Sequence, residues 1–279
     1  MSKQRKIAKN YENVSDFLAD IGVAKEGVAN DSHDKGNKSF FWTNTYEEAE
    51  ALYAKGWPEG VERVAKRREG LSAFLDAAKA AKASEFAWEV TGDFVDVGRV
   101  LSGEPECFGS TWDSGEQQSA RVASIRLNTC VSGSVDAKVI SARGVAVLVA
   151  VDLLESCGIR CEVIVSQGTK THDLLLDSNI VVKRPNEVVD PDRFAFVVAH
   201  PAFFRRFGFR FMELHGHSPS WCYPCPLQDY GKREGVVEID EILSHTGVSD
   251  AELKQNVLQI AEKCGLTFTD EQLEALASA

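Results

Sequence analysis

Hydrophobic residues in the first part of the chain follow the spacing of α-helices. Between residues 61 and 78, apolar side chains recur every three or four positions, which places them on one face of a helix: Val61, Val64, Leu71, Phe74, Leu75 and Ala78. Earlier in the chain, Thr45 is followed three residues later by Glu48, a pattern typical of a helix start. These signals predict a helical N-terminal region over residues 1–82.

The pattern then changes from helical spacing to alternation. The segments 125–131 and 159–166 alternate apolar and polar side chains, as strands with one buried face do. Between them, residues 136–156 are apolar on most sides and stop before Gly158, which is typical of a buried helix. Because a strand, a helix and a strand in this order form a βαβ unit, we expect the two strands to be adjacent and parallel.

The following hundred or so residues carry further strand and helix signals. Residues 174–184 read as a strand, and Asp190 is placed to cap a helix that has Pro191 at its first position. Pro201 is expected to break or kink that helix. The aromatic stretch 207–214 reads as another strand.

The end of the chain has two capping patterns, which start at Ser249 and Thr269 and predict two small helices. The expected fold is therefore of the α/β class. It has a helical N-terminal region (1–82), a three-layer mixed-sheet domain of Rossmann-like type (83–213), and a C-terminal loop with helices (214–279).

Composition restricts the classes of function. No apolar run approaches the roughly 20 residues of a membrane span, and seven cysteines without an apolar leader indicate reduced thiols in a cytoplasm. The net charge of −11 argues against general nucleic-acid binding. The first 82 residues are nearly neutral, and their one basic cluster is interpreted as a solvated helix face: Arg63, Lys66, Arg67 and Arg68.

A turn of small residues, Ser132-Gly133-Ser134, separates the first βαβ strand from its helix. It follows the carboxyl end of a predicted parallel strand, where open α/β sheets place their sites. The sequence lacks the glycines of a nucleophile elbow, the lysine of a P-loop and the three glycines of a dinucleotide fingerprint. A tight turn in which Ser134 caps the helix is the favoured interpretation. An anion or partner contact and a metal site are the alternatives.

This stretch resembles the first strand and helix of von Willebrand factor A-type domains, which carry Asp-x-Ser-x-Ser at this turn and bind a divalent cation with it. Ser132 and Ser134 match the two serines, whereas Cys130 stands at the position of the aspartate. The resemblance covers residues 122–213 and implies a degenerate metal site, because Mg²⁺ requires hard oxygen ligands and a carboxylate. The helix direction is expected to turn the nearby Asp136 away. The candidate binding residues are Ser132, Gly133, Ser134 and Asp136.

A second candidate site follows residue 214 and consists of four possible Zn²⁺ ligands: His215, His217, Cys222 and Cys225. Their spacing matches none of the common zinc knuckles, and Pro219 and Pro224 stand between them. An ordinary surface loop is therefore favoured over a zinc site. A redox role for the two cysteines is a third interpretation, but a redox C-x-x-C pair normally opens a helix after a strand, and the residues after Cys225 do not look like a helix start.

Two further clusters have structural interpretations. Four carboxylates could perform acid–base chemistry, but they also suit a loop held by side-chain hydrogen bonds to the backbone: Asp93, Asp96, Glu104 and Glu106. Arg205 and Arg206 stand among five phenylalanines, a mixture that can grip single-stranded nucleic acid. Packing of a kinked helix in the core is the favoured interpretation of this second cluster.

Four blocks of the sequence resemble an uncharacterised family of proteins encoded by tailed phages and some prokaryotic genomes. The blocks are FWTNTYEEAEALYAKGWPEG, GDFVDVGRVLSGEPEC, ARGVAVLVAVDLLESCGI and DRFAFVVAHPAFFRRFGF, which cover most of residues 40–213. The resemblance implies a viral or mobile-element origin and supplies no chemistry.

Together these observations predict an accessory protein that acts by contacts with a host or phage protein in the host cytoplasm, without catalysis. The alternative is a metal-dependent enzyme, a hydrolase or a nucleic-acid processing enzyme, that uses the Ser132-Gly133-Ser134 turn. Zn²⁺ and Mg²⁺ are the candidate cofactors, and the favoured expectation is that the protein has none. Nucleic acid and membranes are not expected partners.

Overall fold

The structure is a computed structural model, and it describes residues 5–22, 32, 36–83, 86–90, 94–95, 105, 108–111, 121–217, 223–230, 233–240, 249–270 and 272–274. Its α-helices are α1 (Val14–Ile21), α3 (Lys38–Phe41), α4 (Tyr46–Lys55), α5 (Pro58–Gly70), α6 (Ser72–Ala83), α8 (Ala137–Ser156), α9 (Pro191–Ala199), α10 (Phe209–Leu214) and α11 (Asp250–Lys263). A π-helix, η1 (Phe203–Gly208), and a 3₁₀-helix, η2 (Leu227–Tyr230), join them.

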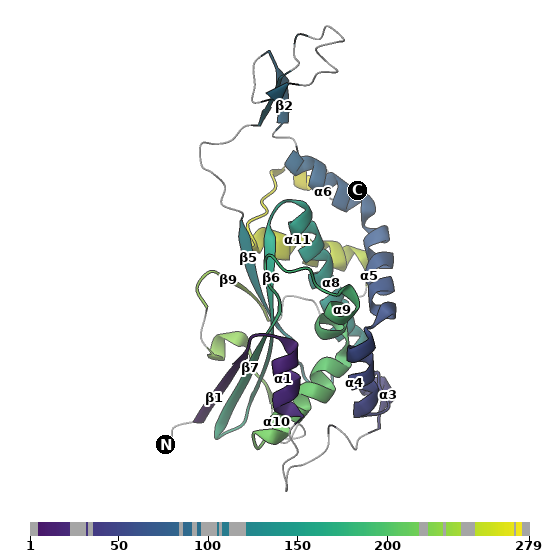
Figure 1. Cartoon of the computed structure of the whole chain (residues 1–279), viewed down its shortest axis with the longest axis vertical. Coiled ribbons are helices and arrows are strands. Elements are labelled where there is room, and N and C mark those ends of the chain that lie inside the picture. The colour runs from purple at the N-terminus through teal and green to yellow at the C-terminus, as the bar shows by residue number, and fades with distance from the viewer. Residues whose placement is uncertain are drawn as a thin grey trace.

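The strands form two sheets (Figure 1). The larger sheet has the order β1-β7-β6-β5-β9, and β8 pairs with β6 beyond the end of β5. Its members are β1 (Arg5–Tyr11), β5 (Val122–Asn128), β6 (Arg160–Lys170), β7 (Leu174–Lys183), β8 (Tyr223–Pro224) and β9 (Val236–Ile239). The smaller antiparallel sheet lies beyond α6 at one end of the molecule and contains β2 (Phe86–Glu89), β3 (Phe94–Val95) and β4 (Phe108–Thr111).

The large sheet is mixed, which confirms the predicted α/β class. β5 runs parallel to both β6 and β9, β6 runs antiparallel to β7, and β7 runs parallel to β1. The predicted βαβ unit is confirmed, because β5 and β6 are adjacent and parallel and α8 connects them. Crossover connections of this kind require a long helix, and the 20 residues of α8 supply it.

The expected all-helical N-terminal region is wrong for residues 5–11, because β1 is an edge strand of the large sheet. Its alternation is weak, since Ile7 and Tyr11 share their face with Lys9. Lys9 and Tyr11 both bind the Asp20 carboxylate of α1, at 2.7 and 2.6 Å, and this attaches the strand to the helix that follows it. The strand therefore depends on partners that a local pattern does not reveal.

The stretch 207–214 was expected to be a strand and is helical instead, split between η1 and α10. Phe203, Phe207 and Phe211 lie four positions apart and are buried on one helical face, a period that the high aromatic content obscures. α9 ends at Ala199, as the proline two residues later requires, and the chain continues directly into η1.

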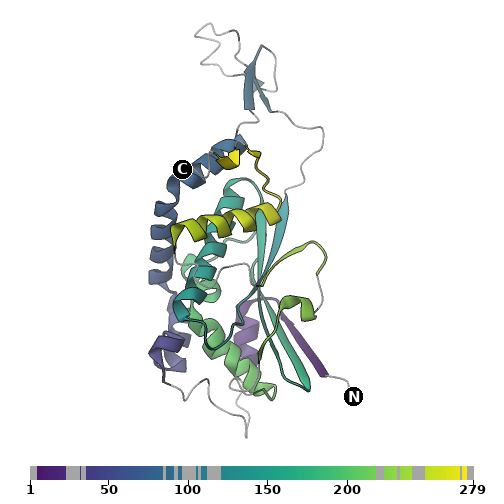
Figure 2. The ribbon, with the colours of Figure 1, turned by 180° about the vertical axis from the view of Figure 1, so that it is seen from behind.

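Apart from the short 3₁₀-helix η2, the helices of the described residues cover one face of the large sheet, as Figures 1 and 2 show from opposite sides. Ile125 and Leu127 of β5 point into the hydrophobic core under α8, whereas Arg126 between them points to the other face. Outside the helices that touch the sheet, α4 and α5 pack on α8 and α9. The helices on this side of the sheet thus form an inner layer that touches the sheet and an outer layer that packs on the inner one.

The core joins parts of the chain that are far apart in the sequence. One hydrophobic cluster includes Phe17 of α1, Phe74 of α6, Val147 of α8 and Val257 of α11.

The division of the chain at residues 82 and 213 stays a prediction. Among the residues that the structure describes, no helix is long and apolar enough to cross a membrane.

A buried polar network occupies the second face of the sheet, centred on Arg126 with 1% exposure. Its guanidinium donates to Asn179 Oδ1 at 2.9 Å and to Ser166 Oγ at 3.2 Å. It also forms ion pairs with Asp177 at 3.0 Å and with Glu238 of β9 at 3.2 Å. The arginine thus connects β5 to β6, β7 and β9, and each carboxylate compensates its buried charge.

The segment around η2 and β9 covers this network. Arg233 donates to Asn10 of β1 at 2.8 Å, so the chain before β9 reaches across the sheet to its opposite edge. Asn128 donates to the carbonyl oxygen of Cys225 at 3.0 Å and to Asp240 at 2.6 Å. Polar contacts, and not a layer of helices, therefore close this face within the described part of the chain.

Candidate functional site

The Ser132-Gly133-Ser134 turn is exposed at the carboxyl end of β5. The hydroxyl oxygens of Ser132 and Ser134 are 3.0 Å apart, and the Val135 N–H donates to the Ser132 carbonyl at 3.0 Å. A side chain added at Gly133 would meet nothing within 4 Å. The geometry is that of a tight turn open to solvent, in agreement with the favoured interpretation.

Asp136, and not Ser134, caps helix α8, so the expected capping residue is wrong. The Asp136 carboxylate accepts a hydrogen bond from the Lys138 N–H at 2.7 Å, and α8 begins one residue after Asp136. An aspartate directly before the first helical residue is the stronger cap, because its charge also interacts favourably with the helix dipole. As the cap, the Asp136 carboxylate points to the start of α8. The side chains of Ser132 and Ser134 take no part in capping and stay in the turn.

Cys130 lies where a cation-binding aspartate would stand in the resembled family. It is buried, with 5% exposure, and its N–H donates to Asn128 Oδ1 at 3.0 Å. A thiol at this point supplies neither a hard oxygen ligand nor a charge, which suits the degenerate form of the site.

We expect Mg²⁺ to leave the melting temperature of the native protein unchanged. Cys130→Asp is expected to create a Mg²⁺-dependent rise, because a ligand that binds only the folded state stabilises it by mass action. Cys130→Asn is the matched control, since it changes shape and polarity without adding the negative charge. Thermal unfolding with and without millimolar MgCl₂ checks this, and a clear rise for the native protein would refute the degenerate site and favour the metal-dependent enzyme.

The histidines of the second candidate site have separate partners. His215 Nδ1 contacts the Phe211 carbonyl oxygen at 2.8 Å, whereas the buried His217 contacts Thr169 Oγ1 of β6 at 3.0 Å through Nδ1. Burial lowers the pKa of His217, and the nearby His215 adds to this effect. Cys225 donates to Asp229 at 2.9 Å.

Cys222 lies outside the described residues, as do the four carboxylates between residues 93 and 106. Within the described ranges, no three His, Cys, Asp or Glu side chains group as metal ligands would. The zinc site therefore stays a prediction.

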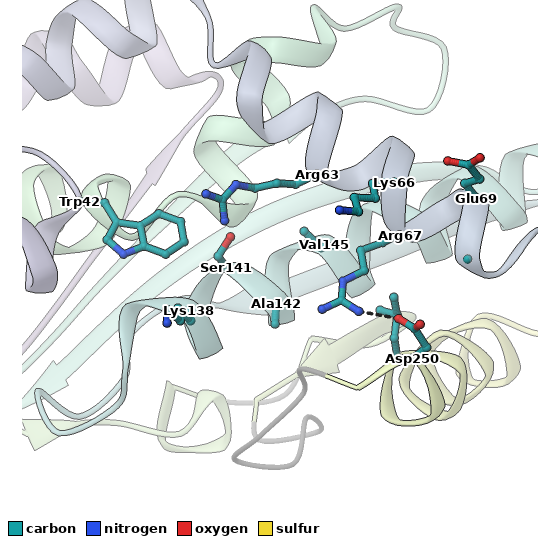
Figure 3. A pocket seen from close by; sticks show the side chains of 12 residues that line it. Trp42, Arg63, Lys66, Arg67, Glu69, Lys138, Ser141, Ala142, Val145 and Asp250 are labelled. Carbon is teal, nitrogen blue, oxygen red and sulfur yellow. Dashed lines mark hydrogen bonds and ion pairs between the residues drawn. The ribbon is translucent and has the colours of Figure 1, made fainter.

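A cleft of about 640 Å³ opens beside the start of α8 (Figure 3). Trp42 closes one end, α5 forms one wall, the first turns of α8 form the floor, and the start of α11 forms the far side. The lining residues are Trp42, Arg63, Lys66, Arg67, Glu69, Gly70, Lys138, Ser141, Ala142, Val145, Asp250 and Leu253. Since Lys138 is two residues from Asp136, the cleft and the strand-end turn are neighbours on α8.

The side chain of Arg63 is held in the cleft by aromatic rings. Its guanidinium carbon lies 4.9 Å from the centroid of the Trp42 ring and 5.9 Å from that of Trp57. The rings of both tryptophans pack edge-on against the buried His200, at 5.8 and 4.7 Å. Burial, with a smaller effect from the charge of Arg63, lowers the pKa of His200 to about 3. The imidazole that packs against the two tryptophans is therefore neutral. The cation–π contact holds the guanidinium charge at the rings without occupying its N–H groups.

Arg67 forms an ion pair with Asp250, the first residue of α11. The start of this helix is fixed by the predicted capping box, in which Ser249 and Glu252 exchange hydrogen bonds. The capping box therefore fixes the position of Asp250. Because Asp250 pairs with Arg67, the capping box also affects the net charge on this side of the cleft.

The interpretation of the basic cluster as a solvated helix face is confirmed, because three of its four side chains are exposed, but this face also borders the cleft. Arg63, Lys66 and Arg67 line the cleft, whereas Arg68 turns to α8 and pairs with Asp152 at 3.3 Å. Positions 63, 66 and 67 share one helical face because they are three and four residues apart. That spacing is the only signal in the sequence that could have indicated the cleft.

The fold and the site define an α/β protein with a mixed sheet, helices over one face and a basic cleft beside a strand-end turn. No curated protein and no solved structure shows a significant match to the chain. Residues 2–267 match a family described as a domain of unknown function (DUF7192), and the chain belongs to that family.

Proposed function

We propose that this protein is a phage-encoded accessory protein that binds a host or phage protein in the host cytoplasm and performs no catalysis. The binding site is the cleft between α5, α8 and α11, and the partner presents an acidic segment to it. The β5–α8–β6 unit is in this proposal a von Willebrand factor A-like unit with a degenerate metal site.

The observation that carries this proposal is the concentration of positive charge in the cleft of an acidic protein. The net charge is −11, yet Arg63, Lys66, Arg67 and Lys138 line one cavity. Such a cavity attracts acidic groups, whereas the acidic rest of the surface repels them, which favours one docking orientation. Its apolar floor of Ala142 and Val145 adds area that a partner side chain can bury.

The proposed origin rests on the blocks that resemble phage proteins, two of which contribute residues to the lining of the cleft. The block that starts at Phe41 contains Trp42 and Trp57, and the block that starts at Ala142 contains the floor of the cavity. The residues that carry the resemblance thus overlap the residues that support binding.

A charge-reversal variant tests the function. Lys66→Glu/Lys138→Glu changes two exposed side chains of the cleft, and Lys55→Glu/Lys263→Glu makes the same change of charge at exposed positions outside it. Proteins captured by the native form from lysate of infected host cells are identified, purified and titrated against all three forms. We expect a partner whose affinity falls at least tenfold with the cleft variant and stays unchanged with the control.

Equal affinity for the cleft variant would show that the partner binds elsewhere. A captured substrate that is chemically converted by the native protein would refute the non-catalytic role.

A further inference from the structure

Three cationic side chains of the cleft form no ion pair within the described part of the chain. Arg63, Lys66 and Lys138 form no ion pair with any described residue, whereas Arg67 is paired with Asp250. Among the described residues, the only other acidic side chain of the lining is that of Glu69, which Figure 3 shows at the opposite end from Trp42. Among the described residues, the charges of these three side chains are therefore available to an anionic ligand.

A buried hydroxyl lies in the same half of the cleft. Ser141 of α8 is 4% exposed, lines the cavity and forms no hydrogen bond with the described residues. Figure 3 shows its oxygen on the side of Arg63. A hydroxyl at this depth is one more donor for a ligand, because it can rotate toward an acceptor.

The number of charges and donors distinguishes two anions. A carboxylate carries one negative charge and two oxygens, and it would leave most of the charge of Arg63, Lys66 and Lys138 uncompensated. A phosphate monoester carries about −1.5 to −2 at neutral pH and presents three strong acceptor oxygens. The guanidinium of Arg63, held beside Trp42, also offers two parallel N–H groups, the geometry that phosphate accepts.

The volume indicates that a phosphate is only part of the ligand. A cavity of about 640 Å³ lies within the range of roughly 300–1,000 Å³ that holds whole small ligands, so a single phosphate leaves most of it empty. The remaining wall includes Ala142, Val145 and Leu253, which suit apolar side chains beside the anion.

We propose that the cleft binds a phosphorylated side chain of the partner protein, with the phosphate between Arg63, Lys66, Lys138 and Ser141. This inference rests on the proposed function and specifies the chemistry of the same site. The neighbouring side chains of the partner segment lie on the apolar floor of α8 and against Leu253.

Titration calorimetry with three short peptides tests the inference. They share the sequence acetyl-Leu-Ala-X-Ala-Leu-amide, in which X is phosphoserine, serine or glutamate, and inorganic phosphate is titrated separately. We expect the phosphoserine peptide to bind at least tenfold more tightly than the glutamate peptide and than inorganic phosphate. Lys66→Glu/Lys138→Glu is expected to abolish this binding, and Lys55→Glu/Lys263→Glu to preserve it.

The other outcomes separate this inference from the proposed function. Equal binding of the glutamate and phosphoserine peptides would refute the proposed preference for phosphate. It would still agree with the proposed binding of an acidic partner segment. If inorganic phosphate binds as tightly as the phosphopeptide, the cleft is a site for free anions. That result would refute the proposal that a segment of a partner protein binds there. If no peptide binds, both the inference and the placement of partner binding in this cleft fail.

Discussion

Gly144→Ala is expected to destabilise the protein by about 3 kcal/mol, the range of an overpacked core. In an ordinary helix the same substitution stabilises by about 1 kcal/mol, because alanine is the better helix former. At Gly144 of α8, however, an added Cβ would lie 2.3 Å from the Ala199 Cα and 2.4 Å from the Val198 carbonyl oxygen. These are backbone atoms at the end of α9 and cannot rotate away, so the two helices must separate.

Gly70→Ala is the matched control for this substitution. Gly70 ends α5, and the nearest atom to an added Cβ is the Asp250 carboxylate oxygen at 3.7 Å, an ordinary contact. We expect unchanged or slightly higher stability for the control. Urea unfolding of both variants measures the difference, and a Gly144→Ala protein as stable as the native one would contradict the close packing of α8 on α9.

Arg126→Met is expected to cost about 3–5 kcal/mol at neutral pH, the usual loss when one partner of a buried ion pair is removed. Methionine fills much of the space, but Asp177 loses its ion pair in a site that is 2% exposed, and Glu238 loses its pair as well. Arg184→Met removes an exposed ion pair with Glu12 and is the control, for which we expect almost no change. Chemical unfolding of both variants provides the comparison.

The loss in Arg126→Met should shrink as the pH falls. Burial raises the pKa of Asp177 in the native protein, while Asn179, Arg126 and Ser166 oppose the shift. Without Arg126, the pKa of this carboxyl rises further above its unfolded value. A carboxyl group of this kind destabilises the fold while it is ionised, so stability returns as the pH falls through the folded pKa. A loss that stays constant from pH 7 to pH 4 would exclude Asp177 as its cause.

Features of the fold that depend on neighbouring residues in the sequence were predictable. The β5–α8–β6 unit follows from alternation, an apolar helix and the length of the crossover. The caps at Thr45, Asp190 and Ser249 follow from residue types at fixed offsets, and each forms the hydrogen bonds that its type permits. These signals are strong because the interactions close within a few residues.

Features that depend on distant partners were missed. Three of the seven residues of β1 are basic. The segment is a strand because it pairs with β7 and because Lys9 forms an ion pair with Asp20. The cleft requires α5, α8 and α11 to meet, and only the spacing of Arg63 and Lys66 belongs to the local sequence. The aromatic content of residues 207–214 suggested a strand. The segment is helical, in agreement with the four-residue spacing of its phenylalanines.

The pairing of β1 with β7 has a consequence for synthesis on the ribosome. Arg5 pairs with Leu174 and Tyr11 with Ile180, so β1 has no strand partner until β7 has been made. At about 5–20 residues per second, the nascent β1 waits on the order of 10–30 seconds. During this time it is an unpaired strand, of the kind that joins foreign edges. The charges of Arg5, Lys6 and Lys9 then protect the growing chain from aggregation before they have any role in the finished fold.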